Sequence, residues 1–559
     1  MKKLISIVSA MILAMPIMAQ QIQKLESKID SLASSHTGKD QPGFVIGVAK
    51  GKEVIFQKAY GQMNLDYQMP ITDQTTFNLA SVSKHITAFA ILKLEEEGKI
   101  NLDAHVHQYI PDLPDYGKKI TVKQLIFHTS GLGSTDNIRL FSGISLEQPW
   151  TAEDEFELIK NYKILNFNPG DEYLYSNAGY GLLAKIIENV SGQAYDDYIE
   201  NELFTPLGMS NSYAYTTPGK TIPNRAVGYK KTANSLERTI TESESVAGGT
   251  NIYMSLEDML IWGRHYFQPT LFDPKVINRL ETSPSKLADG SDLNYTYGLS
   301  LVDYKGIRLV SHSGGTMGFS AYFTWYPEHD MFVAVAANNQ NISTATISRL
   351  VTETLLSEYF VEASLAENED IELPVDQLRK FEGEFKMEDG MVLTFKEKEG
   401  KLFLLIPDTP EFELFASSPS KFYLKAFEAQ TEFLIGSNGE VNELVWFQSG
   451  KSFPGKKDDG SIPSPAPDKD EILGNYYSPD LDVNYQVNLK NDAPILVMPS
   501  TLKYYLGLEN LPMEHFDGDR FKVEKLGEIY FTRDIRKNIN GFVIKDVGRL
   551  RNISFEKTN

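Results

Sequence analysis

The chain has 559 residues, of which 42% are apolar and 23% are charged, and its formal net charge is −21. This length exceeds what one compact core usually holds, so we expect several domains. Nucleic acids and anionic membranes attract basic proteins, so the acidic balance excludes both as principal partners.

Residues 1–19 read MKKLISIVSAMILAMPIMA, with two lysines, a short apolar run and a small residue at Ala19. This order predicts a cleaved secretory signal peptide. The chain contains no cysteine, which excludes both a disulfide and a lipid anchor attached through cysteine. No later stretch reaches the ~18 consecutive apolar residues of a membrane-spanning helix. We therefore expect a soluble protein of a bacterial periplasm, without stable membrane insertion.

Residues 20–365 mix helical and strand patterns, which predicts one layered α+β domain. The clearest signals, in chain order, are a hairpin at 44–61, a buried helix at 86–94, helices at 180–192 and 255–267, two strands within 322–339 and a helix at 345–360. Gly98 and Gly192 mark helix ends, and Ser255 is placed to cap the helix that follows it.

Two stretches of short strands and turns follow this domain. The acidic segment 366–374 is predicted to be a linker that leads to a β module at 375–455. A second linker, 456–470, is rich in proline, glycine and charge, and it leads to a second β module at 471–559.

The two β modules share short sequence features. Residues 378–386 resemble 471–479, so that the Gly-x-Phe of the first module stands opposite the Gly-x-Tyr of the second. Residues 441–447 likewise resemble 547–555. We expect two related small antiparallel barrels or sandwiches, with two unrelated β modules as the alternative.

The motif S-x-x-K occurs five times, but only Ser81 and Lys84 lie at the head of a long apolar helix. Their spacing places both side chains on one face of a helical turn. The N-terminus of a helix favours negative charge, which suits an oxyanion formed at a serine. A lysine with a lowered pKa could accept the serine proton. On the motif alone, a helix cap is the simpler interpretation.

Two further groups of polar residues lie at predicted element boundaries. Tyr175-Ser176-Asn177 is the only Y-x-N in the chain and precedes an apolar helix. A phenol can act as a general acid or base, and the amide of Asn177 can hold a substrate carbonyl. His312-Ser313-Gly314-Gly315 follows a strand pattern, and its glycines permit close approach of a substrate to the backbone. His312 could protonate a leaving group or polarise the tyrosine.

These three motifs, in this order, resemble the penicillin-recognising serine hydrolases, and most nearly the class C β-lactamase-related family. Other matching stretches are TTFNLASVSKHITA, ITVKQLIFHTSGL at 120–132, 168–212 and 247–262. The resemblance spans about 42–360. It implies a β-lactamase/transpeptidase-like domain, in which helices flank an antiparallel sheet beside an all-helical region.

The resemblance also implies the roles of the site residues. Ser81 would be the nucleophile, Lys84 its base-side partner and Tyr175 a second general acid/base. The residues implied in substrate binding are Asn177, His312, Ser313 and Gly314, and the N–H groups of Ser81 and Gly315 would form the oxyanion hole. No cofactor and no metal is implied, and the choice of base between Lys84 and Tyr175 stays open.

His312 stands where many β-lactamases of this family carry a lysine, and a neutral imidazole binds a substrate carboxylate more weakly than an ammonium does. Members with histidine here look more like peptidases, amidases or esterases. We therefore expect an acyl-enzyme hydrolase of a D-amino-acid-containing peptide or a small ester. A true β-lactamase and a non-catalytic peptide-binding sensor are the alternatives. The β modules resemble lipocalin-like barrels. Copies of the chain could associate through these modules as a homo-oligomer.

Overall fold

The structure is a computed structural model. It describes residues 2–36, 40–146, 148–232, 235–240, 244–282, 285–361, 370–387, 391–406, 411–425, 429–436, 438–448, 451–457, 464–506 and 510–558. The chain forms two compact units, of which the first comprises Met1–Phe360 with Pro465–Asn559 and the second comprises Val361–Ser464. Both predicted linkers, 366–374 and 456–470, lie partly outside the described residues.

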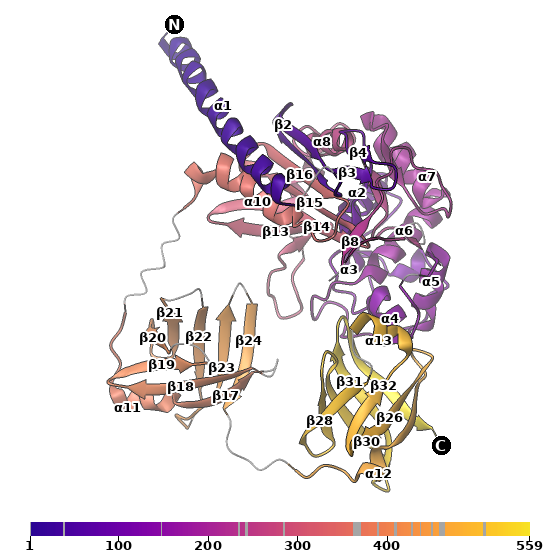
Figure 1. Cartoon of the computed structure of the whole chain (residues 1–559), viewed down its shortest axis with the longest axis vertical. Coiled ribbons are helices and arrows are strands. Elements are labelled where there is room, and N and C mark those ends of the chain that lie inside the picture. The colour runs from indigo at the N-terminus through magenta and orange to yellow at the C-terminus, as the bar shows by residue number, and fades with distance from the viewer. Residues whose placement is uncertain are drawn as a thin grey trace. The chain divides into compact units, whose positions relative to one another are not determined.

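The first unit is built on a seven-stranded antiparallel sheet (Figure 1). Its strands, in spatial order, are β12 (Tyr295–Thr296), β13 (Leu299–Tyr304), β14 (Ile307–Thr316), β15 (Phe319–Tyr326), β16 (Met331–Ala337), β1 (Phe44–Lys50) and β2 (Glu53–Tyr60). Every residue of β16 and nearly every residue of β1 is buried. Uninterrupted burial of this kind means that helices cover both faces of the sheet.

Helices α1 (Lys2–His36) and α10 (Thr344–Leu355) pack on one face, where Leu25 and Ile29 share a core with Ile347 and Val351. Helices α2 (Ser83–Glu96) and α8 (Leu256–His265) belong to the core on the other face. No helix among the described residues combines the length and apolarity needed to cross a membrane.

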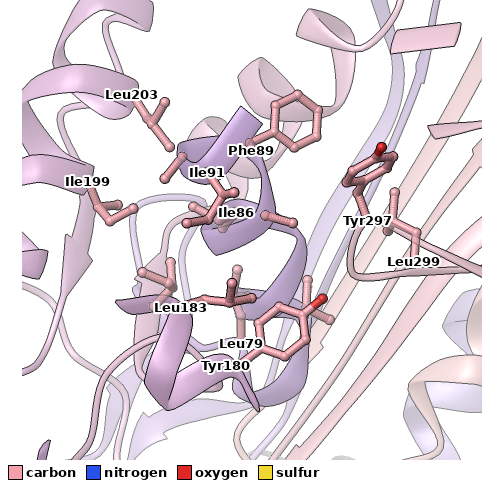
Figure 2. Packing of buried hydrophobic residues seen from close by; sticks show 14 of the residues in the cluster. Leu79, Ile86, Phe89, Ile91, Tyr180, Leu183, Ile199, Leu203, Tyr297 and Leu299 are labelled. Carbon is pink, nitrogen blue, oxygen red and sulfur yellow. The ribbon is translucent and has the colours of Figure 1, made fainter. Parts of the chain in front are cut away.

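The helix predicted from the apolar run at 86–94 is α2, and it lies at the centre of the largest core. Every residue from Ser83 to Leu92 is buried. Figure 2 shows Ile86, Phe89 and Ile91 of this helix among apolar side chains from other elements. A helix buried on all sides holds its first turn rigidly, which matters for the residues discussed below.

The other predicted elements of this region are also confirmed. Residues 44–61 form the hairpin of β1 and β2, and Gly192 ends its helix in the left-handed conformation with φ of +73°. Ser255 caps α8 by accepting a hydrogen bond from the backbone N–H of Asp258. The predicted helix at 345–360 ends at Leu355 and is followed by a short turn.

The α+β region has further helices and several strands of two or three residues. The helices are α3 (Val122–Ile126), α4 (Thr135–Phe141), α5 (Ala152–Asn161), α6 (Asn177–Ser191), α7 (Tyr195–Ile199) and α9 (Pro274–Leu280). The strands are β3 (Gln62–Asn64), β4 (Met69–Pro70), β5 (Phe77–Asn78), β6 (Trp150–Thr151), β7 (Ser212–Ala214), β8 (Tyr229–Lys231), β9 (Leu236–Arg238), β10 (Glu244–Ser245) and β11 (Ile252–Met254).

Each C-terminal β module is a closed eight-stranded barrel. The first comprises β17 (Gly383–Met387), β18 (Val392–Lys398), β19 (Lys401–Leu405), β20 (Phe412–Ala416), β21 (Lys421–Leu424), β22 (Ala429–Ile435), β23 (Val441–Gln448) and β24 (Lys451–Lys457), preceded by α11 (Val375–Leu378). The second comprises β25 (Gly474–Ser478), β26 (Val483–Lys490), β27 (Ala493–Val497), β28 (Leu511–Asp517), β29 (Arg520–Val523), β30 (Gly527–Arg533), β31 (Ile539–Val547) and β32 (Leu550–Thr558), with α12 (Lys469–Ile472) and α13 (Ser500–Leu506).

The first pair of similar segments marks the same place in both barrels. Phe385 and Tyr476 are fully buried on the first strand, and a lysine of the last strand lies over each ring, at 5.7 and 5.8 Å. The predicted match between 441–447 and 547–555 is wrong. Residues 441–448 form the seventh strand of the first barrel, whereas 550–558 form the eighth strand of the second. Neighbouring strands share the same alternation of apolar residues, so a short match can slip by one strand.

The second barrel packs directly on the α+β region within the first unit. Ile138, Phe141 and Tyr162 of that region belong to the barrel's own hydrophobic core. The buried Tyr485 of β26 donates a hydrogen bond to the carbonyl of Phe141 at 3.0 Å. Leu550, at the start of β32, is 1% exposed and joins the same core. This barrel is therefore part of the body that carries the predicted site.

Candidate active site

Ser81 lies in a 3₁₀ turn, Ala80–Val82, that joins β5 to α2. The preceding residue, Ala80, has a left-handed backbone with φ of +48°, a strained conformation for a residue with a side chain. Its N–H donates to Oδ1 of Asn78 at 2.8 Å, which holds the turn in place. Ser81 is partly exposed, whereas the helix behind it is buried, so the hydroxyl stands at the surface of a rigid support.

Lys84 is fully buried one turn further along. Its Nζ lies 3.3 Å from Oγ of Ser81 and donates a hydrogen bond to the carbonyl of Gly249 at 2.8 Å. Burial is the main cause that lowers the pKa of Lys84 to about 7; the nearby Arg549 acts in the same direction, and Asp136 and Glu155 oppose both. A substantial fraction of this lysine is therefore the neutral amine near pH 7.

Lys84 and Arg549 both lie close to the ring of Tyr175. Nζ of Lys84 is 4.9 Å from the ring centroid, and the guanidinium carbon of Arg549 is 4.5 Å from it. Burial raises the pKa of Tyr175, whereas Ser81 and Arg549 lower it. Burial prevails, so Tyr175 is a neutral phenol.

A chain of hydrogen bonds runs behind Tyr175. The N–H of Ser176 donates to Nδ1 of His128, so the proton of this ring lies on Nε2, which faces the Tyr295 hydroxyl at 3.2 Å. Tyr295 then donates to Nε2 of His312 at 3.3 Å, and Nδ1 of His312 donates to the Ser313 carbonyl at 2.5 Å. Both nitrogens of His312 are thus occupied.

His312 is 6% exposed, and burial together with Lys84 lowers its pKa to about 3. It is therefore neutral across the physiological range. Its ring centroid is 6.2 Å from that of Tyr175.

Asn177 is the first residue of α6, and its Nδ2 donates to a carboxylate oxygen of Asp136. Its other amide atom, Oδ1, is buried and has no protein partner. A Cβ added to Gly249 would lie 3.4 Å from Nζ of Lys84 and 3.8 Å from this Oδ1, so both atoms face the same small space.

Strand β14 closes the other side of the site. A Cβ at Gly314 would lie 2.2 Å from the carbonyl oxygen of Leu79, so glycine is required where the strand crosses the nucleophile turn. Gly315 borders open space, and Ser313 is exposed.

A pocket opens in front of these residues. Its lining consists of Ser81, Thr135, Asp136, Arg139, Trp150, Glu155, Asn177, Val246, Ala247, Gly249, Thr250, Gly315 and Thr316. Of the predicted site residues, Ser81, Asn177 and Gly315 line this pocket. Lys84 and Tyr175 are outside the lining but adjoin Ser81 through Lys84. His312, Ser313 and Gly314 are also outside the lining.

Sequence reasoning missed three contributors to the site. His128 has φ of +56°, and its ring centroid lies 4.2 Å from that of Tyr175, with the two ring planes tilted by 31°. Tyr295 links His128 to His312 through its hydroxyl. Arg549 comes from the turn between β31 and β32, and no local motif marks it. Among the described residues, no three His, Cys, Asp or Glu side chains are grouped to hold a metal ion.

The chain is similar to known proteins over much of its length. A family model described as Beta-lactamase matches residues 26–353. Penicillin-binding protein 4* of Bacillus subtilis (strain 168) is 26% identical over 441 residues, which cover 76% of this chain and 96% of that protein. The D-aminopeptidase of Gluconobacter oxydans (strain 621H) is 24% identical over 341 residues, which are 61% of this chain and 63% of that enzyme. This chain thus spans less than two thirds of the D-aminopeptidase.

Among solved structures, the octameric penicillin-binding protein homologue from Pyrococcus abyssi has a TM-score of 0.54 at 25% identity. The match covers 78% of this chain and 100% of that one. The shared region therefore extends beyond the residues that the family model matches.

Proposed function

The chain belongs to the beta-lactamase family of serine hydrolases, and on that premise we propose that it hydrolyses an amide or ester through an acyl-enzyme on Ser81. The observation that carries this proposal is the fully buried Lys84, whose Nζ is 3.3 Å from Oγ of Ser81. A neutral amine at this distance is a competent acceptor for the serine proton.

We assign the base to Lys84 and the acid to Tyr175, because their environments move the two pKa values in opposite directions. Ser81 attacks the carbonyl while Lys84 takes its proton. Tyr175 then donates its phenolic proton to the leaving group and recovers a proton from the Lys84 ammonium. Water attacks the acyl-enzyme in the second half, and its proton returns to Ser81 through the same pair.

The remaining proposed roles are electrostatic. The N–H groups of Ser81 and Gly315 hold the oxyanion. Asn177 positions the acyl side of the substrate by accepting a hydrogen bond from a substrate N–H at Oδ1, since its Nδ2 already donates to Asp136. Support comes from the buried, unpartnered Oδ1 of Asn177 and the open space beside Gly315. The proposed substrate lies along the end of β14, where Gly315 and Thr316 line the pocket. His312-Ser313-Gly314 precede them on the same strand and position them, and Tyr295 holds the ring of His312.

The proposed substrate is a peptide that contains a D-amino acid, or a small ester. Support comes from the D-aminopeptidase and penicillin-binding relatives and from the neutral His312. The decisive experiment is a screen of D-amino-acid amides, D-Ala-D-Ala peptides, nitrocefin and short-chain esters.

The screen uses Ser81→Ala as the blank and Ser83→Ala, a buried neighbour outside the pocket lining, as the matched control. Wild type and Ser83→Ala should hydrolyse at least one substrate and label with a fluorophosphonate. Ser81→Ala should lose at least about 10³-fold in rate and all labelling. Equal labelling of the wild type and Ser81→Ala would refute the nucleophile assignment.

We also propose that the protein is exported, with residues 1–19 removed, and that copies associate through the C-terminal barrels. Support comes from the lysines and apolar run of that segment and from the octameric Pyrococcus neighbour. Mass spectrometry of the exported protein should give a first residue of Gln20, and light scattering should give a mass above one chain. An intact N-terminus would refute the proposed removal of residues 1–19, and a monomeric mass would refute the proposed association.

A further inference from the structure

The turn between β31 and β32 of the second barrel reaches the proposed active site. The turn consists of Gly548 and Arg549, between Val547 and Leu550. A Cβ at Gly548 would lie 2.3 Å from the side chain of Asn137 in α4, so the turn is in close contact with the α+β region.

Three contacts fix the position of this hairpin. Nδ2 of Asn166 donates to the carbonyl of Arg549 at 3.1 Å, and its Oδ1 accepts from the N–H of Arg551 at 2.9 Å. The side chain of Arg551 pairs with Glu172 at 2.7 Å, but both side chains are partly exposed, so this ion pair contributes little to holding the hairpin. Leu550 is buried beside Gly133, where an added Cβ would lie 2.7 Å from its side chain. The backbone of Arg549 is therefore held from both sides.

The side chain of Arg549 is directed at the site rather than at a counter-ion. Its guanidinium lies 4.5 Å from the ring centroid of Tyr175, and its charge lowers the pKa values of Lys84, His128 and Tyr175. Within the part of the chain that the structure describes, no carboxylate lies in ion-pair distance of it. By contrast, Arg551 two residues away is paired with Glu172.

A half-buried guanidinium without a carboxylate partner carries a desolvation cost that a bound anion would offset. Position 312 of β14 supplies no positive charge, because His312 is neutral. Arg549 stacks on Tyr175, the group proposed to protonate the leaving group, so an anion bound there belongs to the leaving-group side of the substrate.

We propose that Arg549 is a specificity residue that binds a carboxylate on the leaving group of the substrate. The substrate class is then a peptide or depsipeptide with a free terminal carboxylate, rather than an amino-acid amide. This inference rests on the proposed function. It assigns to the second barrel a direct part in choosing the substrate.

The experiment compares four matched substrates: N-acetyl-D-Ala-D-Ala, N-acetyl-D-alanyl-D-lactate, and the terminal carboxamide of each. The variants are Arg549→Ala, Arg549→Lys and Arg551→Ala, each checked for folding by thermal unfolding. Arg551→Ala removes a charge from the same hairpin that faces Glu172 instead of the site.

We expect the wild type to prefer the carboxylates. Arg549→Ala should lower kcat/KM for the carboxylates by about 10- to 100-fold, mainly through KM, and for the carboxamides by less than about threefold. Arg549→Lys should restore part of the preference, and Arg551→Ala should retain it.

Equal losses on carboxylate and carboxamide substrates, or the same loss in Arg551→Ala, would show that Arg549 only supports the fold and would overturn the inference. Ser81-dependent hydrolysis without a carboxylate preference overturns this inference alone. Absence of any Ser81-dependent hydrolysis across the wider screen overturns the proposed function, and the inference with it.

Discussion

Lys84 and Tyr175 are both largely removed from water, and burial moves their pKa values in opposite directions because one is a cation when protonated and the other is an anion when deprotonated. The pair thus holds a neutral amine beside a neutral phenol near pH 7. Neither state could be derived from S-x-x-K or Y-x-N, since both depend on the surrounding side chains.

The lowered pKa of Lys84 predicts a pH dependence. Only the neutral amine accepts the serine proton, so kcat/KM should fall about tenfold per unit below pH 7 and reach a plateau above it. Arg549→Ala removes a charge that lowers this pKa, while Asp136 and Glu155, which raise it, remain. The variant's midpoint should therefore move to higher pH.

The measurement is the initial rate from pH 5 to pH 9 on a carboxamide substrate, whose own charge does not change there. Circular dichroism at each pH excludes unfolding as the cause of lost rate. A flat profile, or a midpoint that Arg549→Ala leaves in place, would contradict the assignment of Lys84 as the base.

Predictability differed among the site residues for a physical reason. Ser81, Lys84, Tyr175 and Asn177 stand at the starts of helices, so their motifs carry information about local structure as well as chemistry. His312 was found, but its two hydrogen-bond partners and its low pKa depend on Tyr295 and on burial. A sequence window around His312 contains Ser313 but neither Tyr295 nor the groups that bury the ring.

The hairpin β31–β32 is the element that joins the second barrel to the site, and Asn166 is its main polar anchor. Asn166 is 6% exposed and uses both amide atoms on the hairpin backbone. Asn166→Ala leaves a buried carbonyl and a buried N–H without partners. We expect it to lower the free energy of unfolding by about 1–3 kcal/mol and to raise KM for carboxylate substrates.

The control is Asn488→Ala, an exposed position on β26 of the same barrel, which should change stability by less than about 0.5 kcal/mol. Chemical denaturation and steady-state kinetics provide the two readouts. If Asn166→Ala loses stability but keeps KM, the position of the hairpin does not govern substrate binding.

Elements with strong local signals were predicted well, among them the buried helix α2 and the β1–β2 hairpin. The match between 441–447 and 547–555 was misplaced by one strand because it depended on a signal that is not local. Strands of one barrel alternate apolar and polar residues in the same way, and register is decided by neighbours across the sheet that no short segment contains.

The whole molecule has two compact units, although the sequence predicted three folded parts in tandem. The α+β region and the second barrel share one core through Ile138, Phe141 and Tyr162, whereas the first barrel has a core of its own. The composition of a sequence does not reveal contacts between residues hundreds of positions apart. The shared core of the α+β region and the second barrel therefore could not be predicted from the sequence.

Calorimetry of the full chain should therefore show two unfolding transitions. Leu550→Ala should lower the free energy of unfolding of the first unit by about 2–5 kcal/mol and leave the transition of the second unit unchanged. Leu404→Ala, fully buried in the first barrel, should do the reverse. Three separate transitions, or a shift of both by either variant, would contradict the shared core.

The two-residue turn between β31 and β32 bears on which residues of this enzyme can change during evolution. Close contact with Asn137 requires a glycine at position 548, and burial requires an apolar residue at position 550. Neither requirement applies to the side chain of Arg549 between them. A substitution at position 549 should therefore leave the scaffold intact, although loss of the charge raises the pKa of Lys84. If Arg549 has the proposed role, selection for new leaving groups would act first at this position, and related enzymes with this barrel should differ there sooner than at Ser81 or Lys84.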